Sequence, residues 1–370
     1  MIKTWNKIYF NKYKKNSQRK RKRKNIKKLH LKILLIFILF IYIIISNFLI
    51  FNRPSTKIPK NEFKSSTYKK NFTGRIFLCA GYNNEAEMLY IQVWRLYNYV
   101  DKFIFTVSNR THSGLPKHFS LYPFEKELQP YMDKIEFIHF DNICDRNLYP
   151  YDEIVWCTEQ SQRDYPKYYL EQNYNLNEND LIIVVDIDEI LTREGIEYIL
   201  EYPLKERIYH IKGSMYFPYY YHNVGDWNCG CIIRYNKLMK SLNYYRHNLY
   251  DYLLKYENNP SKPLITHCSY CFRNIEKYRN KLQSYAHQEY NKEPYITNDW
   301  LFKSHYCRIK IGSDEGHDEP YEGWRDLIPD DKRLKYLVDP SYTYDLSKTS
   351  YTKKDLETLC NKTYRRTPFE

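Results

Sequence analysis

The pattern of hydrophobic and polar residues is most pronounced at residues 181–191, which read Leu-Ile-Ile-Val-Val-Asp-Ile-Asp-Glu-Ile-Leu. Five apolar residues, most of them β-branched, lead directly into Asp186, Asp188 and Glu189. An unbroken apolar run of this length is typical of a strand buried on both faces of a mainly parallel sheet. Because ligands bind beyond the carboxyl ends of such strands, the pattern predicts three carboxylates where a substrate would bind.

Shorter apolar runs predict the rest of a sheet. These further predicted strands cover 75–80, 103–107 and 135–139. Apolar residues at helical spacing predict helices near 89–100 and 158–172, and Thr192 is expected to cap a short helix that ends near Leu200. Strands that alternate with helices indicate an α/β fold with a mixed, mainly parallel sheet.

A long apolar segment precedes the sheet, at 33–51, where Ser46 and Asn47 are the polar residues. As a helix it would be about 28 Å long, close to the ~30 Å hydrocarbon core of a membrane. A cleavable signal peptide is the alternative, but its apolar core is usually shorter and a small-residue cleavage site should follow it. We therefore predict a single-pass signal anchor, with a cytoplasmic basic tail at 1–32 and a polar stem at 52–74.

The net charge of +14 belongs to the tail, since residues 1–32 contain 14 Lys or Arg residues and no acid. The rest of the chain carries 44 basic and 44 acidic residues. This balance excludes a nucleic-acid-binding protein of the strongly basic kind. The run at 19–24 resembles a nuclear-localisation or RNA-binding patch, but directly before an apolar span it favours a cytoplasmic N-terminus.

The body of the chain, 75–360, is therefore expected to lie in a lumen. Its pattern becomes aromatic and irregular after Ile208, which indicates two halves, 75–207 and 208–360. Three tripeptides fit the N-glycosylation sequon and agree with luminal exposure. They begin at Asn71, Asn109 and Asn361.

The chain has nine cysteines. An oxidising lumen favours disulfides, and an odd number leaves at least one cysteine free or bonded to another chain, but the sequence does not determine the pairs. Cys79 lies in an apolar run and is expected to be an inert buried thiol. A zinc knuckle is an alternative for four of the others, which lie near His267, although a lumen disfavours it. These four are Cys229, Cys231, Cys268 and Cys271.

The loop that carries Asp186, Asp188 and Glu189, here called the acidic loop, needs a cation or a shared proton, because carboxylates this close repel one another. Hard divalent ions such as Mg²⁺ and Mn²⁺ bind carboxylate oxygens and leave positions open for phosphate. A phosphatase of the haloacid-dehalogenase type also places Asp-x-Asp after a buried strand. In that fold the motif opens the domain and a Thr or Val usually stands where this chain has Ile190, so we disfavour this alternative.

Several segments occur in an order that resembles glycosyltransferase family 17. They are Cys79-Ala-Gly-Tyr-Asn-Asn-Glu85, Ser108-Asn-Arg-Thr111 with Gly114-Leu-Pro-Lys117, Glu159-Gln-Ser-Gln-Arg163, Asp186-Ile-Asp-Glu-Ile190 and His267-Cys-Ser-Tyr-Cys-Phe272. The last of these is the most specific, and the resemblance covers roughly 75–345. It implies a GT-A-like fold, a type II Golgi membrane enzyme, a sugar-nucleotide donor and inversion at the anomeric carbon.

The resemblance implies that N-acetylglucosamine moves from UDP-GlcNAc to a glycan, such as the β-mannose of an N-glycan core. The half at 75–207 would bind the donor and the half at 208–360 the acceptor. The alternative is a luminal glycan-binding protein that kept the fold and lost catalysis. Calorimetry separates the two, because a transferase binds UDP with Mn²⁺, whereas a lectin binds glycans whether or not EDTA is present.

A divalent cation, Mn²⁺ or Mg²⁺, would stabilise the departing diphosphate. We expect Asp188 to bind it directly and Asp186 to contact it through water or to bind the ribose. Glu189 either does the same or fixes the loop. His267 is a candidate for completing the metal shell, as are His287 and His305, although a lone histidine is more often structural.

Candidates for contacts with the donor follow the first strand, at Asn83, Asn84 and Glu85, where uracil or ribose would bind. Their alternative role is a turn and a helix cap. Arg163 is a candidate for a phosphate contact, with a solvated ion pair as the alternative.

Inversion also needs a general base within about 3 Å of the acceptor hydroxyl. Glu289, Asp299 and Asp314 are the candidates, and their spacing in the sequence does not separate them.

Overall fold

The computed structural model describes most of the chain from residue 72 onward. The described residues are 72–141, 144, 151–202, 204–217, 223–228, 230–248, 252–255, 257, 262–308, 328–338, 347 and 349–363. All belong to one structural unit, Glu62–Glu370. The predicted tail and the predicted anchor at 33–51 lie outside the described residues. Within the described ranges, no helix is long and apolar enough to cross a membrane.

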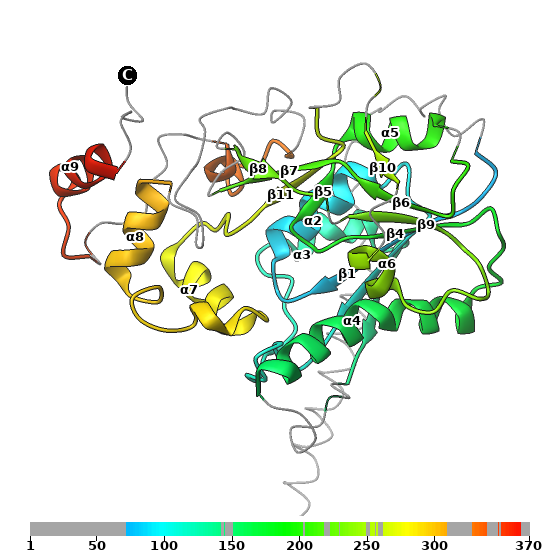
Figure 1. Cartoon of the computed structure of the whole chain (residues 1–370), viewed down its shortest axis with the longest axis horizontal. Helices are drawn as coiled ribbons and strands as arrows, with labels where there is room; N and C mark the ends of the chain where they lie inside the picture. The colour runs from blue at the N-terminus through cyan, green and yellow to red at the C-terminus, as the bar shows by residue number, and fades with distance from the viewer. Residues whose placement is uncertain are drawn as a thin grey trace, which may run out of the picture. The chain divides into compact units, whose positions relative to one another are not determined.

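Seven strands form one mixed sheet in the order β10-β6-β9-β4-β1-β2-β3 (Figure 1). They are β1 (Ile76–Tyr82), β2 (Lys102–Val107), β3 (Ile135–His139), β4 (Leu181–Val184), β6 (Ile208–Ile211), β9 (Cys231–Arg234) and β10 (Leu253–Leu254). β1 is parallel to both β2 and β4, and β2 is parallel to β3, whereas β9 is antiparallel to its neighbours β4 and β6. The predicted α/β fold with a mainly parallel sheet is thus confirmed.

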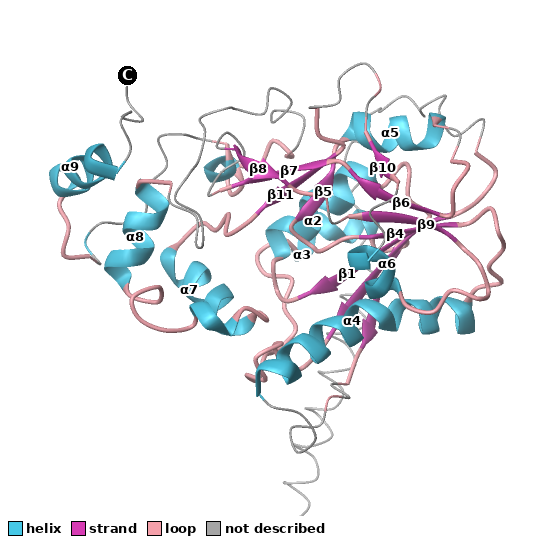
Figure 2. Cartoon of the chain, in the orientation of Figure 1, coloured by secondary structure: helices cyan, strands magenta, loops and turns pink. Residues whose placement is uncertain are grey.

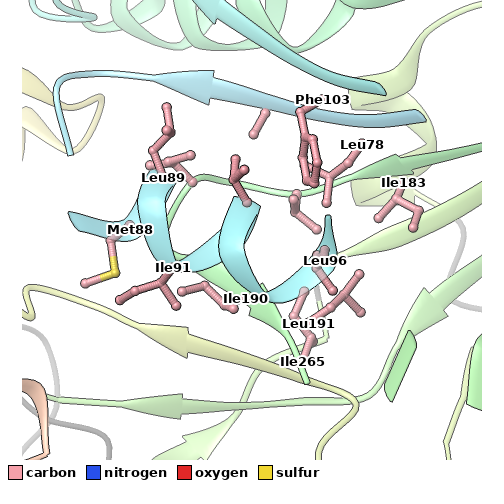
Figure 3. Close-up of a cluster of buried hydrophobic side chains, with 14 of the residues drawn as sticks. Leu78, Met88, Leu89, Ile91, Leu96, Phe103, Ile183, Ile190, Leu191 and Ile265 are labelled. Atoms are coloured by element: carbon pink, nitrogen blue, oxygen red, sulfur yellow. The ribbon is translucent and has the colours of Figure 1, made fainter. Parts of the chain in front are cut away.

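The apolar run of β4 is buried on both faces, as its composition predicts. Leu181 and Ile183 belong to one buried cluster together with α2 (Ala86–Leu96), whereas Ile182 and Val184 belong to a second cluster that includes residues of α4 (Tyr151–Asn173) and α6 (Leu242–Asn248). Figure 3 shows the first cluster, with Leu89 of α2 among side chains of the sheet. Helices therefore cover both faces of β4 (Figure 2).

A second sheet has the order β5-β11-β7-β8. Its strands are β5 (Glu189–Leu191), β7 (Gly213–Tyr216), β8 (Asn223–Asp226) and β11 (Ile265–Cys268). The chain leaves the first sheet at Val184 and enters the second at Glu189, so the acidic loop spans the gap between the two sheets. α2 packs against β5 as well as the first sheet, and side chains from all three belong to one buried cluster.

The remaining helices of the described chain are short. They are α3 (Glu125–Leu128), α5 (Arg193–Glu201), α7 (Ile275–Ser284), α8 (Asn298–Tyr306) and α9 (Lys353–Thr363), with 3₁₀ turns at Gln129–Tyr131, Gln288–Tyr290 and Lys335–Leu337. Thr192 caps α5 as predicted, because its side chain accepts a hydrogen bond from the Gly195 backbone N–H at 2.8 Å. The strands β6, β9 and β10 extend the first sheet, so the boundary predicted near Ile208 falls within one sheet.

Three disulfides are formed by cysteines of the described chain. They join Cys144 to Cys157, Cys268 to Cys271 and Cys307 to Cys360. The alternative of a zinc knuckle is wrong, because Cys268 and Cys271 bond to each other rather than to a metal. Cys79 is a buried free thiol, as predicted, and burial raises the pKa of its side chain, with a smaller contribution from Cys231.

Asp180 joins the beginnings of β1 and β4. Its carboxylate accepts hydrogen bonds from the Arg75 backbone N–H (2.9 Å), Arg75 Nε (3.1 Å) and Arg75 Nη2 (2.7 Å), and from the Asn177 backbone N–H (2.9 Å). Burial alone would raise the pKa of Asp180, but these hydrogen bonds outweigh it and hold the pKa below its ordinary value. Asp180 thus fixes the two adjacent central strands at the end opposite the acidic loop.

We predict that Asp180→Asn lowers the free energy of unfolding of the full-length chain by about 1–3 kcal/mol near neutral pH, because buried hydrogen-bond donors lose a charged acceptor. Urea unfolding measures the change. The control Asp133→Asn alters an exposed carboxylate that binds the Tyr97 hydroxyl, and it should change stability by less than about 1 kcal/mol.

The difference in stability between wild type and Asp180→Asn should also depend on pH. A carboxyl group whose folded pKa is depressed stabilises the fold fully above its unfolded pKa of about 3.9, and this contribution is lost as the pH falls through the folded pKa. The stability difference between wild type and Asp180→Asn should therefore be constant from about pH 5 to pH 7 and shrink below about pH 4. A difference that grows on acidification would contradict this assignment.

Candidate functional site

A cleft of about 510 Å³ lies at the carboxyl ends of the parallel strands. The acidic loop contributes Asp186, Ile187 and Asp188 to its lining, and the segments after β1 and β2 contribute Asn83 and His112. Further lining comes from α4, α6, α7 and the second sheet. The cleft therefore lies where the sequence analysis predicted a ligand site.

Glu189 is buried behind the cleft lining, where its hydrogen bonds fix the path of the acidic loop. It is fully buried, and its Oε1 accepts hydrogen bonds from Trp227 Nε1 (2.6 Å) and Arg246 Nη2 (2.5 Å). Its Oε2 accepts from Arg246 Nη1 (2.7 Å) and from the Asp186 backbone N–H (2.8 Å). Of the two roles that the sequence left open for Glu189, the contacts favour the structural one, since a buried charge with a full set of partners is satisfied where it lies.

Asp186 lines the cleft but is engaged by two arginines. Arg163 donates to both of its oxygens, from Nε at 3.0 Å and from Nη2 at 2.8 Å, and Arg246 Nη2 donates at 3.0 Å. Burial alone would raise the pKa of Asp186, but the charges of Arg163 and Arg246 outweigh it and hold the pKa well below its ordinary value. Arg163 also pairs with Glu159 at 2.5 Å, so its guanidinium is committed to two carboxylates.

The contacts of Asp188 are longer than those of Asp186 and Glu189. Its Oδ2 lies 3.4 Å from His267 Nε2 and 3.5 Å from Lys281 Nζ. Burial would raise the pKa of Asp188, but the charge of Lys281, followed by His267, holds the pKa below its ordinary value. Lys281 also donates to Glu85 at 2.7 Å. Burial would lower the pKa of Lys281, but Glu85 and Asp188 raise it, so the ammonium group stays protonated.

Asp188 and His267 fit a divalent cation. Two ligands at right angles around an ion, each about 2.1 Å from it, lie about 3.0 Å apart, close to the 3.4 Å observed between Asp188 Oδ2 and His267 Nε2. The buried Nδ1 of His267 has no hydrogen-bond partner among the described residues. Within that part of the chain no three His, Cys, Asp or Glu side chains converge as a complete metal shell. Phosphate oxygens and water would supply the other ligands, as they commonly do for Mg²⁺.

The candidates that follow β1 separate into two groups. Asn83 and Glu85 line the cleft, and the Asn83 side chain bonds Ser284 Oγ at 3.2 Å and Lys117 Nζ at 2.8 Å. Asn84 lies outside the lining, and its φ of +68° places it in the left-handed region, which asparagine tolerates in turns. Asn84 therefore has the turn role that the sequence left as the alternative.

The three candidates for the general base lie in different parts of the chain. Glu289 accepts a hydrogen bond from His287, which lines the cleft. Asp299 lies in the first turn of α8, away from the cleft lining, and binds the backbone N–H and the hydroxyl of Ser350. Asp314 lies outside the described residues. Of the histidines named as possible metal ligands, His305 lies in α8 and does not line the cleft.

Several lining residues were not predicted from the sequence. Arg246 comes from α6 and Lys281 from α7, 57 residues from Glu189 and 196 residues from Glu85, respectively, and no local pattern marks either. The aromatic residues of the lining were hidden by the abundance of tyrosine in the chain. They are Trp156, Trp227, Tyr270, Tyr285 and Tyr290.

A family model described as glycosyltransferase family 17 matches residues 63–314, more than half of the chain. No curated protein matches the chain. The matched range includes the first sheet, the second sheet, the acidic loop and all the described residues of the cleft.

We predict that Arg246→Met destabilises the full-length chain by about 3–5 kcal/mol, because it leaves the buried carboxylate of Glu189 without its cation. Chemical denaturation measures the loss. The control Lys353→Met removes one member of an exposed pair with Glu357, 4.0 Å apart, and should cost less than about 1 kcal/mol. Equal effects of the two substitutions would contradict the structural role of Arg246.

Proposed function

Because the chain belongs to glycosyltransferase family 17 and is therefore a glycosyltransferase, we propose that it is a metal-dependent, inverting enzyme that uses a UDP-sugar. N-acetylglucosamine from UDP-GlcNAc is the proposed donor sugar. The proposed acceptor is a glycan, such as the β-mannose of an N-glycan core. The donor and the acceptor follow from the family resemblance of the motifs, and the metal follows from the cleft.

The observation that carries the proposal is the contrast between three neighbouring acids. Asp186 and Asp188 both line the cleft, but Asp186, like the buried Glu189, accepts short hydrogen bonds from arginines, whereas Asp188 lies 3.4 Å from His267 and 3.5 Å from Lys281. Asp188 and His267 would hold a Mn²⁺ or Mg²⁺ ion. That ion supplies a Lewis acid for the diphosphate leaving group.

The chain adds fixed positive charge beside this pair. Lys281 lies 3.5 Å from Asp188 and stays protonated, so it can stabilise negative charge that develops on a departing diphosphate. Asp186 holds the guanidinium groups of Arg163 and Arg246 in place next to it. These groups are positioned before any ligand binds, so they need little reorganisation during the reaction.

We also propose that the enzyme is a type II Golgi membrane protein, anchored by 33–51 with its folded body in the lumen. The disulfides of the body support this, because such bonds persist in oxidising compartments. The exposed sequon residue Asn109 offers a test. Asn109→Gln should remove one glycan and increase electrophoretic mobility, as treatment with an endoglycosidase would. A chain that carries no glycan and is digested by protease added outside intact vesicles would contradict this topology.

We predict that Asp188→Ala lowers transfer at least about 100-fold with Mn²⁺ present, because the loss of a metal ligand removes several kcal/mol of transition-state stabilisation. A panel of UDP-sugars with a glycan array measures transfer, and calorimetry measures Mn²⁺-dependent UDP binding, which should also weaken. The fold should persist, as judged by circular dichroism.

The matched control for this experiment is Asp133→Ala, which removes an exposed carboxylate that is not part of the cleft lining and should leave both activities unchanged. Full transfer by Asp188→Ala would remove the metal-site proposal. Glycan binding by the wild type that is indifferent to EDTA, with no transfer from any donor, would favour the non-catalytic alternative.

A further inference from the structure

One part of the cleft is lined by aromatic side chains rather than by charged ones. Trp156 of α4 and the segment after α7 line it, and the His287 ring lies edge-on to Trp156, with ring centroids 4.7 Å apart. The ring centroids of Tyr285 and Tyr290 lie 5.4 Å and 6.1 Å from the centroid of the His287 ring. Aromatic side chains combine an apolar surface with polar edges, which suits a sugar ring and its hydroxyl groups.

Glu289 fixes the orientation and the tautomer of His287. His287 Nδ1 lies 2.6 Å from Glu289 Oε1, and both side chains are about half exposed. Because an ionised carboxylate can only accept, the hydrogen of the neutral ring lies on Nδ1 and the lone pair lies on Nε2. An imidazole held in this way by a carboxylate is prepared to take a proton at Nε2.

The carboxylates that line the described part of the cleft are committed to cations. Glu85 binds Lys281 and Glu159 binds Arg163. Asp186 and Asp188 make the contacts described above, with two arginines and with Lys281 and His267. Protonation of any of the four would therefore remove the negative charge that pairs with a cation or with a bound metal.

The other imidazoles that line the described part of the cleft are similarly occupied. His112 Nε2 bonds Gln162 Oε1 at 2.6 Å, and burial lowers the pKa of this histidine. His247 Nε2 lies 3.3 Å from Arg163 Nη1, and His267 faces Asp188. His287 differs from these three because it is about half exposed and its carboxylate partner, Glu289 at 2.6 Å, is not a proposed metal ligand, so its Nε2 stays available to a substrate.

We propose that His287 is the general base of the transfer reaction and that Glu289 is its positioning residue. This inference rests on the proposed function, with a nucleoside diphosphate sugar as donor and a sugar hydroxyl as acceptor. His287 Nε2 takes the hydroxyl proton while the acceptor oxygen bonds to the anomeric carbon. The bond from that carbon to the phosphate oxygen breaks, and its electron pair leaves with the nucleoside diphosphate. The proton then passes from His287 to water.

The first test compares two histidines that each face a carboxylate. His287→Ala should lower kcat by about 10²–10⁴-fold and leave the dissociation constant of UDP, measured by calorimetry with Mn²⁺, within about twofold of wild type. The matched control is His139→Ala, because His139 lies on the surface 3.4 Å from Asp141 and outside the cleft lining. This control should leave kcat unchanged.

The second test separates chemistry from structure. Imidazole added to His287→Ala should restore kcat in proportion to its concentration, because it supplies the missing base, and it should not change the His139→Ala variant. Glu289→Gln should lower kcat by up to about 10⁴-fold, because the amide no longer holds the histidine in the tautomer that accepts a proton at Nε2, with little change in the affinity for UDP.

Three results would overturn the inference. One is a His287→Ala variant with the kcat of wild type. Another is a variant that loses UDP binding together with activity and does not respond to imidazole, since that indicates a structural role. The third is a loss of kcat in Asp314→Asn that exceeds the loss in His287→Ala. If the wild type transfers sugar in each case, the proposed function stands, whereas no transfer by wild type from any UDP-sugar would remove the proposed function itself.

Discussion

The arrangement of the cleft depends on the buried ion pair between Arg246 and Glu189. Two hydrogen bonds of 2.5 Å and 2.7 Å join the side chains, and both residues are almost completely inaccessible to solvent. Such a pair is not in itself strong evidence for stability, because its desolvation is costly. Its value here is positional, since Glu189 also binds the Asp186 backbone N–H and so fixes the path of the acidic loop between the two sheets.

This fixed loop gives three acids in four positions three different environments. Glu189 is turned inward, Asp186 is held by Arg163 and Arg246 at the edge of the cleft, and Asp188 faces His267 and Lys281. The chemical type of the residue does not decide its role. The length of the contacts separates the three, because Glu189 and Asp186 accept hydrogen bonds of 3.0 Å or less from arginines, whereas the cationic partners of Asp188 lie 3.4 Å and 3.5 Å away.

The fold was predictable because it follows from local patterns. The apolar run of β4 and the Thr192 cap identified their elements from a few residues each. The donors that complete the cleft were not predictable, because they arrive from α6 and α7 through contacts between distant segments. For the same reason Asp299 was a reasonable candidate in sequence and lies elsewhere in space, where it binds Ser350. A carboxylate in a sequence motif indicates possible chemistry, but its partners are set only by packing.

The two kinds of lining in the cleft constrain what can bind it. The ionic part combines Asp188 of the acidic loop with Lys281 of α7, His267 of β11 and the arginines of α4 and α6. The aromatic part comes from Trp156 and the segment after α7. The two parts share elements, because α4 with Trp156 packs on β1 and β2, and α7 carries Lys281 directly before the aromatic segment. The packing of α4 and α7 therefore positions both parts together.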